Sequence, residues 1–352
     1  MIVKKEVLKF EKAIDIIKKV ESEPEPKFLW HGIPEGSKGI ITGVAKTGKT
    51  TLAENLAISL SAGKKEFMGY PLIGEPQKVL FINLEESQRL YGRRNLKQIS
   101  ELSESELNLF NENYLCAPST FPEFFTTDKD WNCLRDTIIA SKAKVVIIDS
   151  LTHMFDGEIE KSNPAKKFIE KLRATFKDLD VTLIVVHHNT KGNNSPITQD
   201  NIAGSRVILQ EFEFAIGLAN VPTGAGGSYM CMLYNKHIEK DDTTAFLYKM
   251  NEKGWINVIG KTNKFKLYKD NFDGRASSVN KDAVFKYIEN QVSQGSMTVK
   301  TSSISQGLVK AGIMSKDTMH KCLNKLGTDG SIVKEGRGSY ILSKKDGYEQ
   351  EV

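Results

Sequence analysis

The central part of the chain alternates short apolar runs with longer stretches whose apolar residues recur at helical spacing. Buried strands are expected at Gly39–Thr42, Val79–Asn83, Val145–Ile148, Thr182–Val186 and Phe214–Leu218. Helices are expected between them, at Lys49–Ser61, Ser87–Ser100, Asp130–Ser141 and Pro164–Leu179. Near-continuous apolar strands joined through helices are typical of a parallel sheet covered on both faces. The pattern therefore predicts an α/β fold.

The pattern changes at both ends of this region. Apolar runs joined by polar turns predict antiparallel strands at Met230–Tyr234, Ala245–Met250 and Trp255–Val258. At the start, residues 1–20 have the spacing of an amphipathic helix, which ends at Glu21–Pro26 because proline disfavours helix both at and before itself. The apolar stripe of this helix must be buried, either on its own domain or on a neighbouring subunit.

The last quarter of the chain has a third pattern. Residues 261–277 are polar and basic, as in a linker, and they precede expected helices at Asp282–Val292, Thr301–Ala311 and Lys316–Leu326 and two short strands within Ser331–Leu342. Three helices and a β-hairpin are the elements of a winged helix, a variant of the helix-turn-helix. The expected domains are an N-terminal helix and linker (1–27), the α/β domain (28–260), a linker (261–277), a winged-helix domain (278–345) and a tail (346–352).

Length and composition limit the classes of protein that need considering. A chain of 352 residues is long enough for two domains. No run approaches the roughly 20 apolar residues of a membrane helix, and the first residues lack the apolar core of a signal peptide. We therefore expect a soluble, cytoplasmic protein. The four cysteines stand apart, without the spacing of metal ligands, and are expected to be isolated thiols.

The positive charge of the chain is concentrated near its end. From Lys261 onward there are 16 basic and 10 acidic residues, whereas the preceding part has 33 basic and 34 acidic residues. Such asymmetry favours a module that binds a polyanion, most simply nucleic acid. Lys316 and Lys321 on the expected recognition helix, and Arg337 at the turn of the hairpin, are candidate DNA contacts. Winged helices that bind protein are the alternative.

The most specific motif follows the first expected strand. Residues 43–50 match the pattern GxxxxGK[ST], between a strand and a helix as phosphate binding requires. The glycines let backbone N–H groups face the phosphates, and the helix N-terminus adds its positive end. We expect Lys49 to contact the β- and γ-phosphates and Thr50 to bind Mg²⁺. The predicted ATP-binding residues are Gly43, Val44, Ala45, Lys46, Thr47, Gly48, Lys49, Thr50 and Thr51.

A second acidic element follows the strand Val145–Ile148. Asp149 stands at its end, where a Walker B carboxylate would hold Mg²⁺ through water. The simpler alternative is an Asp that caps the next helix. Beside a phosphate-binding motif, we favour the metal ligand.

The order of these elements resembles that of the RecA-like P-loop ATPases, over residues 28–260. In that family a Glu after the second strand activates the attacking water, and Phe81-Ile82-Asn83-Leu84-Glu85 is similar to this element. The resemblance implies a RecA-like parallel-sheet core in which Glu85 is the catalytic carboxylate. A carboxylate at the end of a strand beside the phosphates is suited to orient water. Glu86 is the competing candidate.

A finer resemblance, to the RepA-like hexameric helicases, rests on the paired histidines in Leu183–Gly192. It implies that His188 senses the γ-phosphate and that the following loop, which contains Lys191, faces nucleic acid. A metal site at His187 and His188 is disfavoured, because adjacent strand residues point to opposite faces. The segment Asp200–Ser205 matches the family's Gly-Ser element less well.

The family's arginine finger is not where the resemblance would put it. The aligned position is Glu213, so the finger cannot be transferred directly. Lys236, in Tyr234-Asn235-Lys236-His237, and Arg206 are the candidates for a basic residue that acts on a neighbouring subunit's site, and Lys236 is preferred.

These resemblances imply an ATP-hydrolysing motor that acts on DNA, similar to RepA-type replicative helicases of mobile elements. Such a protein would be a homo-oligomeric ring, expected to be a hexamer, with single-stranded DNA in a central channel and duplex at the winged helix. Two alternatives share the same catalytic residues. One is an ATP-dependent loader, recombination mediator or defence-system ATPase without unwinding, and the other is a DNA-binding regulator switched by ATP.

Overall fold

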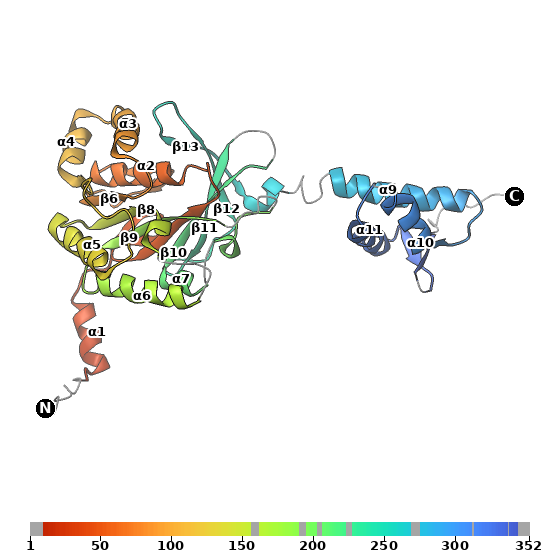
Figure 1. Ribbon diagram of the computed structural model, residues 1–352, viewed down its shortest axis with the longest axis horizontal. Coiled ribbons are helices and arrows are strands. Elements are labelled where there is room, and N and C mark those ends of the chain that lie inside the picture. The colour runs from red at the N-terminus through yellow and green to blue at the C-terminus, as the bar shows by residue number, and fades with distance from the viewer. Residues whose placement is uncertain are drawn as a thin grey trace. The chain divides into compact units, whose positions relative to one another are not determined.

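The computed structural model describes residues 10–155, 162–189, 195–202, 206–222, 227–268, 275–311, 313–336 and 338–343. The chain divides into two compact units whose main boundary lies between Lys264 and Phe265. Figure 1 shows the elements of both units.

The first unit is built on one nine-stranded sheet in the order β13-β12-β11-β10-β3-β9-β8-β6-β7. The strands from β10 to β7 are parallel, and those from β10 to β13 are antiparallel. This confirms the α/β fold and the antiparallel extension expected from the sequence. The strands are β3 (Lys38–Gly43), β6 (Val79–Asn83), β7 (Tyr114–Cys116), β8 (Val145–Asp149), β9 (Thr182–His188), β10 (Phe214–Asn220), β11 (Ser228–Asn235), β12 (Thr244–Met250) and β13 (Ile256–Asn263).

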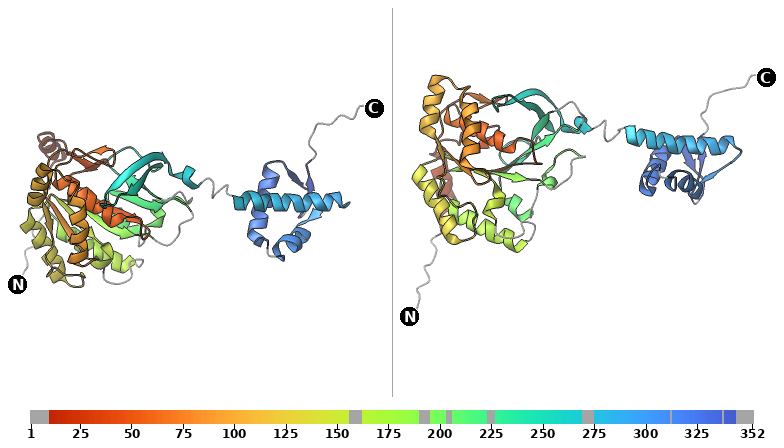
Figure 2. Two further views of the ribbon diagram at one scale, coloured as in Figure 1. Left: turned by 90° about the horizontal axis from the view of Figure 1, so that it is seen from above. Right: turned by 45° about the horizontal axis from the view of Figure 1, so that its top comes forward.

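Helices lie on both faces of this sheet (Figures 1 and 2). One layer contains α2 (Lys49–Ser61), α3 (Gln88–Ile99) and α4 (Glu104–Asn113), and the other contains α5 (Asp128–Ser141), α6 (Ser162–Phe176) and α7 (Arg206–Glu211). The four helices expected from the sequence are present. The sequence pattern did not predict α4, α7 or β7, although a capping box formed by Ser103 and Glu106 marks the start of α4.

Short elements connect or border these layers. Two small antiparallel pairs join β1 (Phe28–Trp30) to β2 (Ile33–Pro34) and β4 (Glu66–Phe67) to β5 (Tyr70–Pro71). Single 3-10 turns are η1 (Leu151–Met154), η2 (Gln199–Asn201) and η3 (Lys264–Tyr268). The strand β13 reaches Asn263, so the sheet extends into the segment expected to be a linker.

Helix α2 is the central helix of the unit. All of its residues except Thr50 are buried, and its apolar side chains belong to the main hydrophobic core. Its polar side chains are used inside the protein: Asn55 donates to the carbonyl of Gly254 (3.1 Å) and accepts from the backbone N–H of Ile256 (2.9 Å). Because buried polar groups are costly unless they are paired, these bonds tie α2 to the β12–β13 end of the sheet.

The helix expected near the N-terminus is present as α1 (Ala13–Glu21), and none of its residues is buried. The exposed fraction is 96% for Phe10 and about half for Ile14, Ile17 and Val20. All residues from Phe10 to Phe28 are exposed. Of the two expected ways to bury its apolar stripe, folding back onto its own domain is not what the structure shows.

The second unit contains the expected three helical segments and hairpin. They are α9 (Arg275–Ser293), α10 (Thr301–Ile304) with the π-helical turn η4 (Ser305–Val309), α11 (Lys316–Thr328), β15 (Ile332–Lys334) and β16 (Ser339–Leu342). A short strand that was not expected, β14 (Val299–Lys300), completes a three-stranded sheet in the order β14-β16-β15. The unit has its own hydrophobic core, which includes Ile288, Ile304, Met319 and Leu323.

A search of the described helices for length and apolarity found none able to cross a membrane.

Candidate nucleotide-binding site

The residues singled out in the sequence converge at one edge of the sheet. Strands β3, β9, β8 and β6 are adjacent and parallel, so their carboxyl ends lie side by side. In the observed register Gly43 pairs with His188, and Asn83 pairs with Asp149. The loops that follow parallel strands are where ligands of open α/β sheets bind.

The loop between β3 and α2 has the backbone conformation that its glycines permit. Gly48, directly before α2, has a φ of +86°, in the left-handed region that favours glycine. A Cβ on Gly43 would lie 2.3 Å from the carbonyl oxygen of Leu218. The loop is also held from β12, because the Tyr248 hydroxyl donates to the carbonyl of Thr47 (2.5 Å). These contacts restrict the conformation of the loop, which leads directly into the N-terminus of α2.

Lys49 starts α2 and is held close to the loop. Its Nζ donates to the carbonyl of Val44 at 2.9 Å, and the residue is 6% exposed. Burial lowers the pKa of Lys49, while the charges of Asp149 and Glu85 act in the opposite direction. A buried ammonium beside a helix N-terminus is a suitable partner for phosphate oxygens, which would replace its missing hydration.

Thr50 and Asp149 form the part of the site that fits a magnesium ion. The Thr50 hydroxyl donates to Oδ2 of Asp149 at 2.6 Å. Asp149 is 1% exposed, and its Oδ1 is buried without a hydrogen-bond partner in the described structure. Mg²⁺ prefers oxygen ligands and usually takes one or two from protein, with phosphate oxygens and water completing its shell. The donor set and the unpaired Oδ1 therefore fit this ion.

The pKa of Asp149 also fits a magnesium site. Burial raises the pKa of Asp149 to about 6, and the charge of Glu85 adds to this, whereas the Thr50 bond and Lys49 lower it. A carboxylate that is costly to ionise alone is stabilised by a bound cation. This helps explain why Asp149 is buried next to a hydroxyl ligand instead of being exposed.

The two candidate carboxylates after β6 face different neighbours. The side chain of Glu85 lies 4.0 Å from Nε2 of His188, on the side of β9, and Glu85 interacts electrostatically with Lys49 and Asp149. Glu86 instead pairs with Arg94 at 2.7 Å and borders a cavity of about 500 Å³ that also touches Cys116 of β7. The geometry favours Glu85 as the residue facing the nucleotide, and its catalytic role stays a prediction.

The paired histidines have different surroundings, as strand alternation predicts. His187 is 1% exposed, within the sheet, whereas the side chain of His188 is 39% exposed. Burial and the charge of Lys49 lower the pKa of His188, which favours the neutral ring at neutral pH. The Thr42 hydroxyl donates to Oδ1 of Asn189 (2.5 Å), and the Asn189 N–H donates to the Gly43 carbonyl (3.2 Å). The end of β9 is therefore bonded to the start of the phosphate loop.

Of the two candidate trans-acting residues, Lys236 lies away from the site of its own chain. Lys236 follows β11, whose Asn235 pairs with Phe214 beside Gly39 at the start of β3. It is thus at the opposite edge of the sheet, and its Nζ donates to the Gln210 carbonyl at 3.3 Å. Arg206 begins α7, and its side chain lies outside the described part. Action on a neighbouring subunit stays a prediction for both.

Glu213, at the position aligned with the family's finger, has a structural role. Its carboxylate accepts from the Lys38 N–H (3.0 Å) and contacts Nε2 of His237 (2.7 Å). Among the candidate nucleic-acid contacts, Lys191 and Arg337 lie outside the described residues. Lys316 and Lys321 are exposed on α11.

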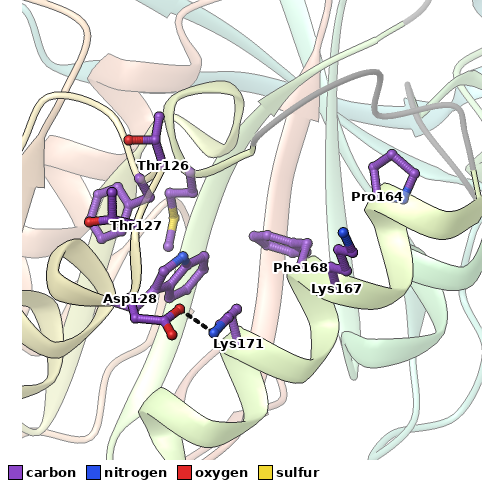
Figure 3. A pocket seen from close by; sticks show the side chains of 10 residues that line it. Thr126, Thr127, Asp128, Pro164, Lys167, Phe168 and Lys171 are labelled. Atoms are coloured by element: carbon purple, nitrogen blue, oxygen red, sulfur yellow. Dashed lines mark hydrogen bonds and ion pairs between the residues drawn. The ribbon is translucent and has the colours of Figure 1, made fainter.

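A separate cavity of about 500 Å³ lies between the start of α5 and α6 (Figure 3). Phe125, Trp131 and Phe168 form its apolar part, and an ion pair between Asp128 and Lys171 borders it. Its lining includes none of the predicted ATP-binding residues.

Three groups that shape the site were not expected from the sequence. They are Tyr248 of β12, which bonds to the phosphate loop, Asn189 directly after β9, and Arg94, which joins Glu86 to Glu54 of α2. Asn189 directly follows the paired histidines in the sequence, so the same motif could have indicated it. Arg94 and Tyr248 act across 40 and 201 positions of sequence, respectively, and no local pattern marks such contacts.

Similarity to known proteins was found at two levels, that of the family and that of the solved structure. A family model described as an AAA domain, AAA_25, matches residues 5–194, which is more than half of the chain. Among solved structures, a KaiC-like protein, PH0186, from the hyperthermophilic archaeon Pyrococcus horikoshii OT3 is similar, with 16% sequence identity and a TM-score of 0.47. That similarity covers 64% of this chain and 91% of the other. Among curated proteins, none matches the chain.

The assignment of Glu85 predicts different effects for two matched substitutions. Glu85→Gln should keep ATP binding but lower the turnover number by about 10²–10⁴, the usual contribution of a general base. Glu86→Gln should keep most of the turnover, since an amide oxygen can still accept from Arg94. Steady-state phosphate release and titration with a fluorescent ATP analogue measure both quantities. Equal loss in the two variants would contradict the assignment.

Proposed function

Because the chain belongs to the AAA_25 family of AAA domains and is a RecA-like P-loop ATPase, we propose that it is a motor that uses hydrolysis of Mg-ATP to act on DNA. The observation that carries the ATP site is the bond of 2.6 Å between Thr50 and Asp149, directly beside Lys49. Hydroxyl, carboxylate and ammonium are the three groups that phosphoryl transfer needs from a P-loop protein.

In this proposal each residue has one task. Lys49 and the N–H groups of the loop bind the phosphates and stabilise the charge that develops on them. Thr50 and Asp149 would hold Mg²⁺, which would neutralise charge on the phosphate oxygens. Glu85 orients the attacking water and accepts its proton.

Coupling to DNA would pass through the end of β9. His188 lies at the carboxyl edge of the sheet, 4.0 Å from Glu85, and the loop with Lys191 follows it directly in the chain. A side chain that responds to the γ-phosphate there would be joined by a few bonds to a loop suited to contact single-stranded DNA. The bond between Thr42 and Asn189 supports this, because it ties the same segment to the phosphate loop.

The second unit has the features expected of a duplex-binding module. Its element order, with a hairpin after the last helix, supports the proposal that it is a winged helix. Met319, Leu323 and Leu326 of α11 are buried, which leaves the opposite face of the helix exposed. Lys321 and Lys325 are exposed along the helix, and Lys316 is exposed in its first turn. Exposed lysines on the helix directly before the hairpin support DNA binding over a purely structural role.

We further propose that the chain forms a homo-oligomer, with a hexamer implied by the resemblance to RepA-like helicases. Two observations support it. Lys236 is exposed at the edge of the sheet opposite its own phosphate loop, so it could act only on another copy. The apolar stripe of α1 is uncovered, and exposed apolar side chains in such a row favour burial against a partner.

The rate of ATP hydrolysis by a DNA motor should depend on the presence of DNA. We expect single-stranded DNA to raise the steady-state rate of ATP hydrolysis several-fold over the rate without DNA, with duplex less effective. Lys49→Ala provides the blank. A rate that is the same with single strands, with duplex and without DNA would favour an ATP switch or a loader that remodels protein.

DNA binding by the second unit predicts a charge-dependent effect. Replacing Lys316, Lys321 and Lys325 together by Ala should weaken duplex binding and reduce the slope of log affinity against log salt by about 1 for each phosphate that is no longer neutralised. Fluorescence anisotropy at several salt concentrations measures this. The matched control is Lys129→Ala, an exposed lysine of α5. Unchanged affinity and slope in the triple variant would contradict the assignment and favour protein docking.

The proposed oligomer can be tested through α1. Light scattering should give a mass several times that of one chain in the presence of Mg²⁺ and a slowly hydrolysed ATP analogue. Replacing Ile14 and Ile17 by Asp should reduce that mass, because charges would stand on the face that becomes buried. A monomer at every protein concentration, with and without analogue, would contradict shared sites.

A further inference from the structure

A buried acidic residue of the central helix is connected to the catalytic turn through one arginine. Glu54 lies on α2, one turn beyond Thr50, and its side chain has no exposed surface. Arg94 of α3 donates to both of its carboxylate oxygens, from Nε and Nη2, each at 2.7 Å. The amide of Gln98 adds a third bond at 3.1 Å. Such a two-bond pair fixes the plane of the guanidinium as well as its position.

The same guanidinium holds the residue next to Glu85. Nη2 of Arg94 lies 2.7 Å from Oε2 of Glu86, so one group bridges two carboxylates. The backbone of this turn is held independently by Asn83, whose Oδ1 accepts from the N–H groups of Glu85 (3.2 Å) and Glu86 (3.1 Å). Asn83 fixes the backbone of the turn and Arg94 fixes the Glu86 side chain, and together they set the direction in which the Glu85 side chain leaves the backbone.

The direction in which Glu86 is pulled matters for Glu85. Glu86 is drawn toward α3 and away from the carboxyl ends of β8 and β9, while Glu85 faces His188. If the contact between Glu86 and Arg94 were lost, this turn would no longer be tied to α3, and Glu85 could rotate away from the site with it.

We propose that Arg94 is a positioning residue for ATP hydrolysis, which clamps Glu86 to Glu54 of α2 and thereby holds the turn in the orientation that presents Glu85 to the attacking water. This rests on the proposed ATPase function and on Glu85 as its base. Helix α2 also provides Lys49 and Thr50. The clamp therefore fixes the position of Glu85 relative to the helix that would bind the phosphates and the metal. Small errors in such placement are costly to turnover.

The test uses Glu86, because its removal leaves the buried pair of Arg94 and Glu54 intact. In the full-length chain, Glu86→Ala should lower the turnover number about tenfold, as expected when a reacting group is misplaced by a fraction of an ångström. The KM for ATP and the thermal unfolding midpoint should stay near those of the wild type. Glu86→Gln should recover most of the turnover, because its amide oxygen accepts from Arg94. Glu112→Ala, an exposed acidic residue at the end of α4, is the control.

Each other result has a distinct meaning. Unchanged turnover in Glu86→Ala would overturn the clamp, and so would equal losses in the Ala and Gln variants, which would make Glu86 itself the base. Wild-type turnover no higher than that of Lys49→Ala would refute the proposed function separately. In that case crystal structures decide the clamp: a Glu85 side chain with the same orientation in the wild type and in Glu86→Ala would overturn it.

Discussion

The structure depends above all on the shared direction of its central strands. Because β3, β9, β8 and β6 are parallel and adjacent, the residues after them reach the same edge of the sheet. Gly43, His188, Asp149 and Glu85 come from four separate parts of the chain, yet the register brings them together. An antiparallel neighbour at any of these positions would send its final residue to the far edge, as β11 does with Lys236.

Helix α2 turns this convergence into a rigid site. Its first turn carries Lys49 and Thr50, and the rest of it is buried in the core. Polar residues along it are bonded to distant segments: Asn55 to the β12–β13 turn and Glu54 to α3. Each bond satisfies a buried group that would otherwise be costly, so the helix cannot shift without exposing or breaking them. Lys49 and Thr50, at the start of this helix, are therefore held in a fixed position relative to the sheet.

Much of this arrangement was predictable from the sequence because it is local. The phosphate loop, the strand before it and the helix after it lie within one short segment, and apolar runs marked the parallel strands. The alternation of strand side chains also predicted that His187 and His188 would differ, as their exposure shows. The helix α4 has no buried residue, so its apolar period is weak and only the capping box at Ser103 marks it, and β7 is too short for a clear period.

The remaining features depend on contacts between distant segments. Nothing near Arg94 in the sequence shows that it pairs with Glu54 and Glu86 at once, since α3 must first be packed on α2. The location of Lys236 depended on the register of β11 with β10, which apolar periodicity does not specify. For the same reason the sequence left both Glu85 and Glu86 as candidates for the catalytic carboxylate. Only the fold shows that Glu85 faces His188 and Glu86 faces Arg94.

The central claim is that Lys49, Thr50 and Asp149 form one site for Mg-ATP. A crystal structure of the chain with Mg²⁺ and a slowly hydrolysed ATP analogue tests it most directly. We expect Mg²⁺ at about 2.0–2.1 Å from the Thr50 hydroxyl, the usual distance for this ion, with Asp149 bound to it through water and Lys49 at the γ-phosphate. A nucleotide bound elsewhere, or no binding at millimolar analogue, would contradict the account.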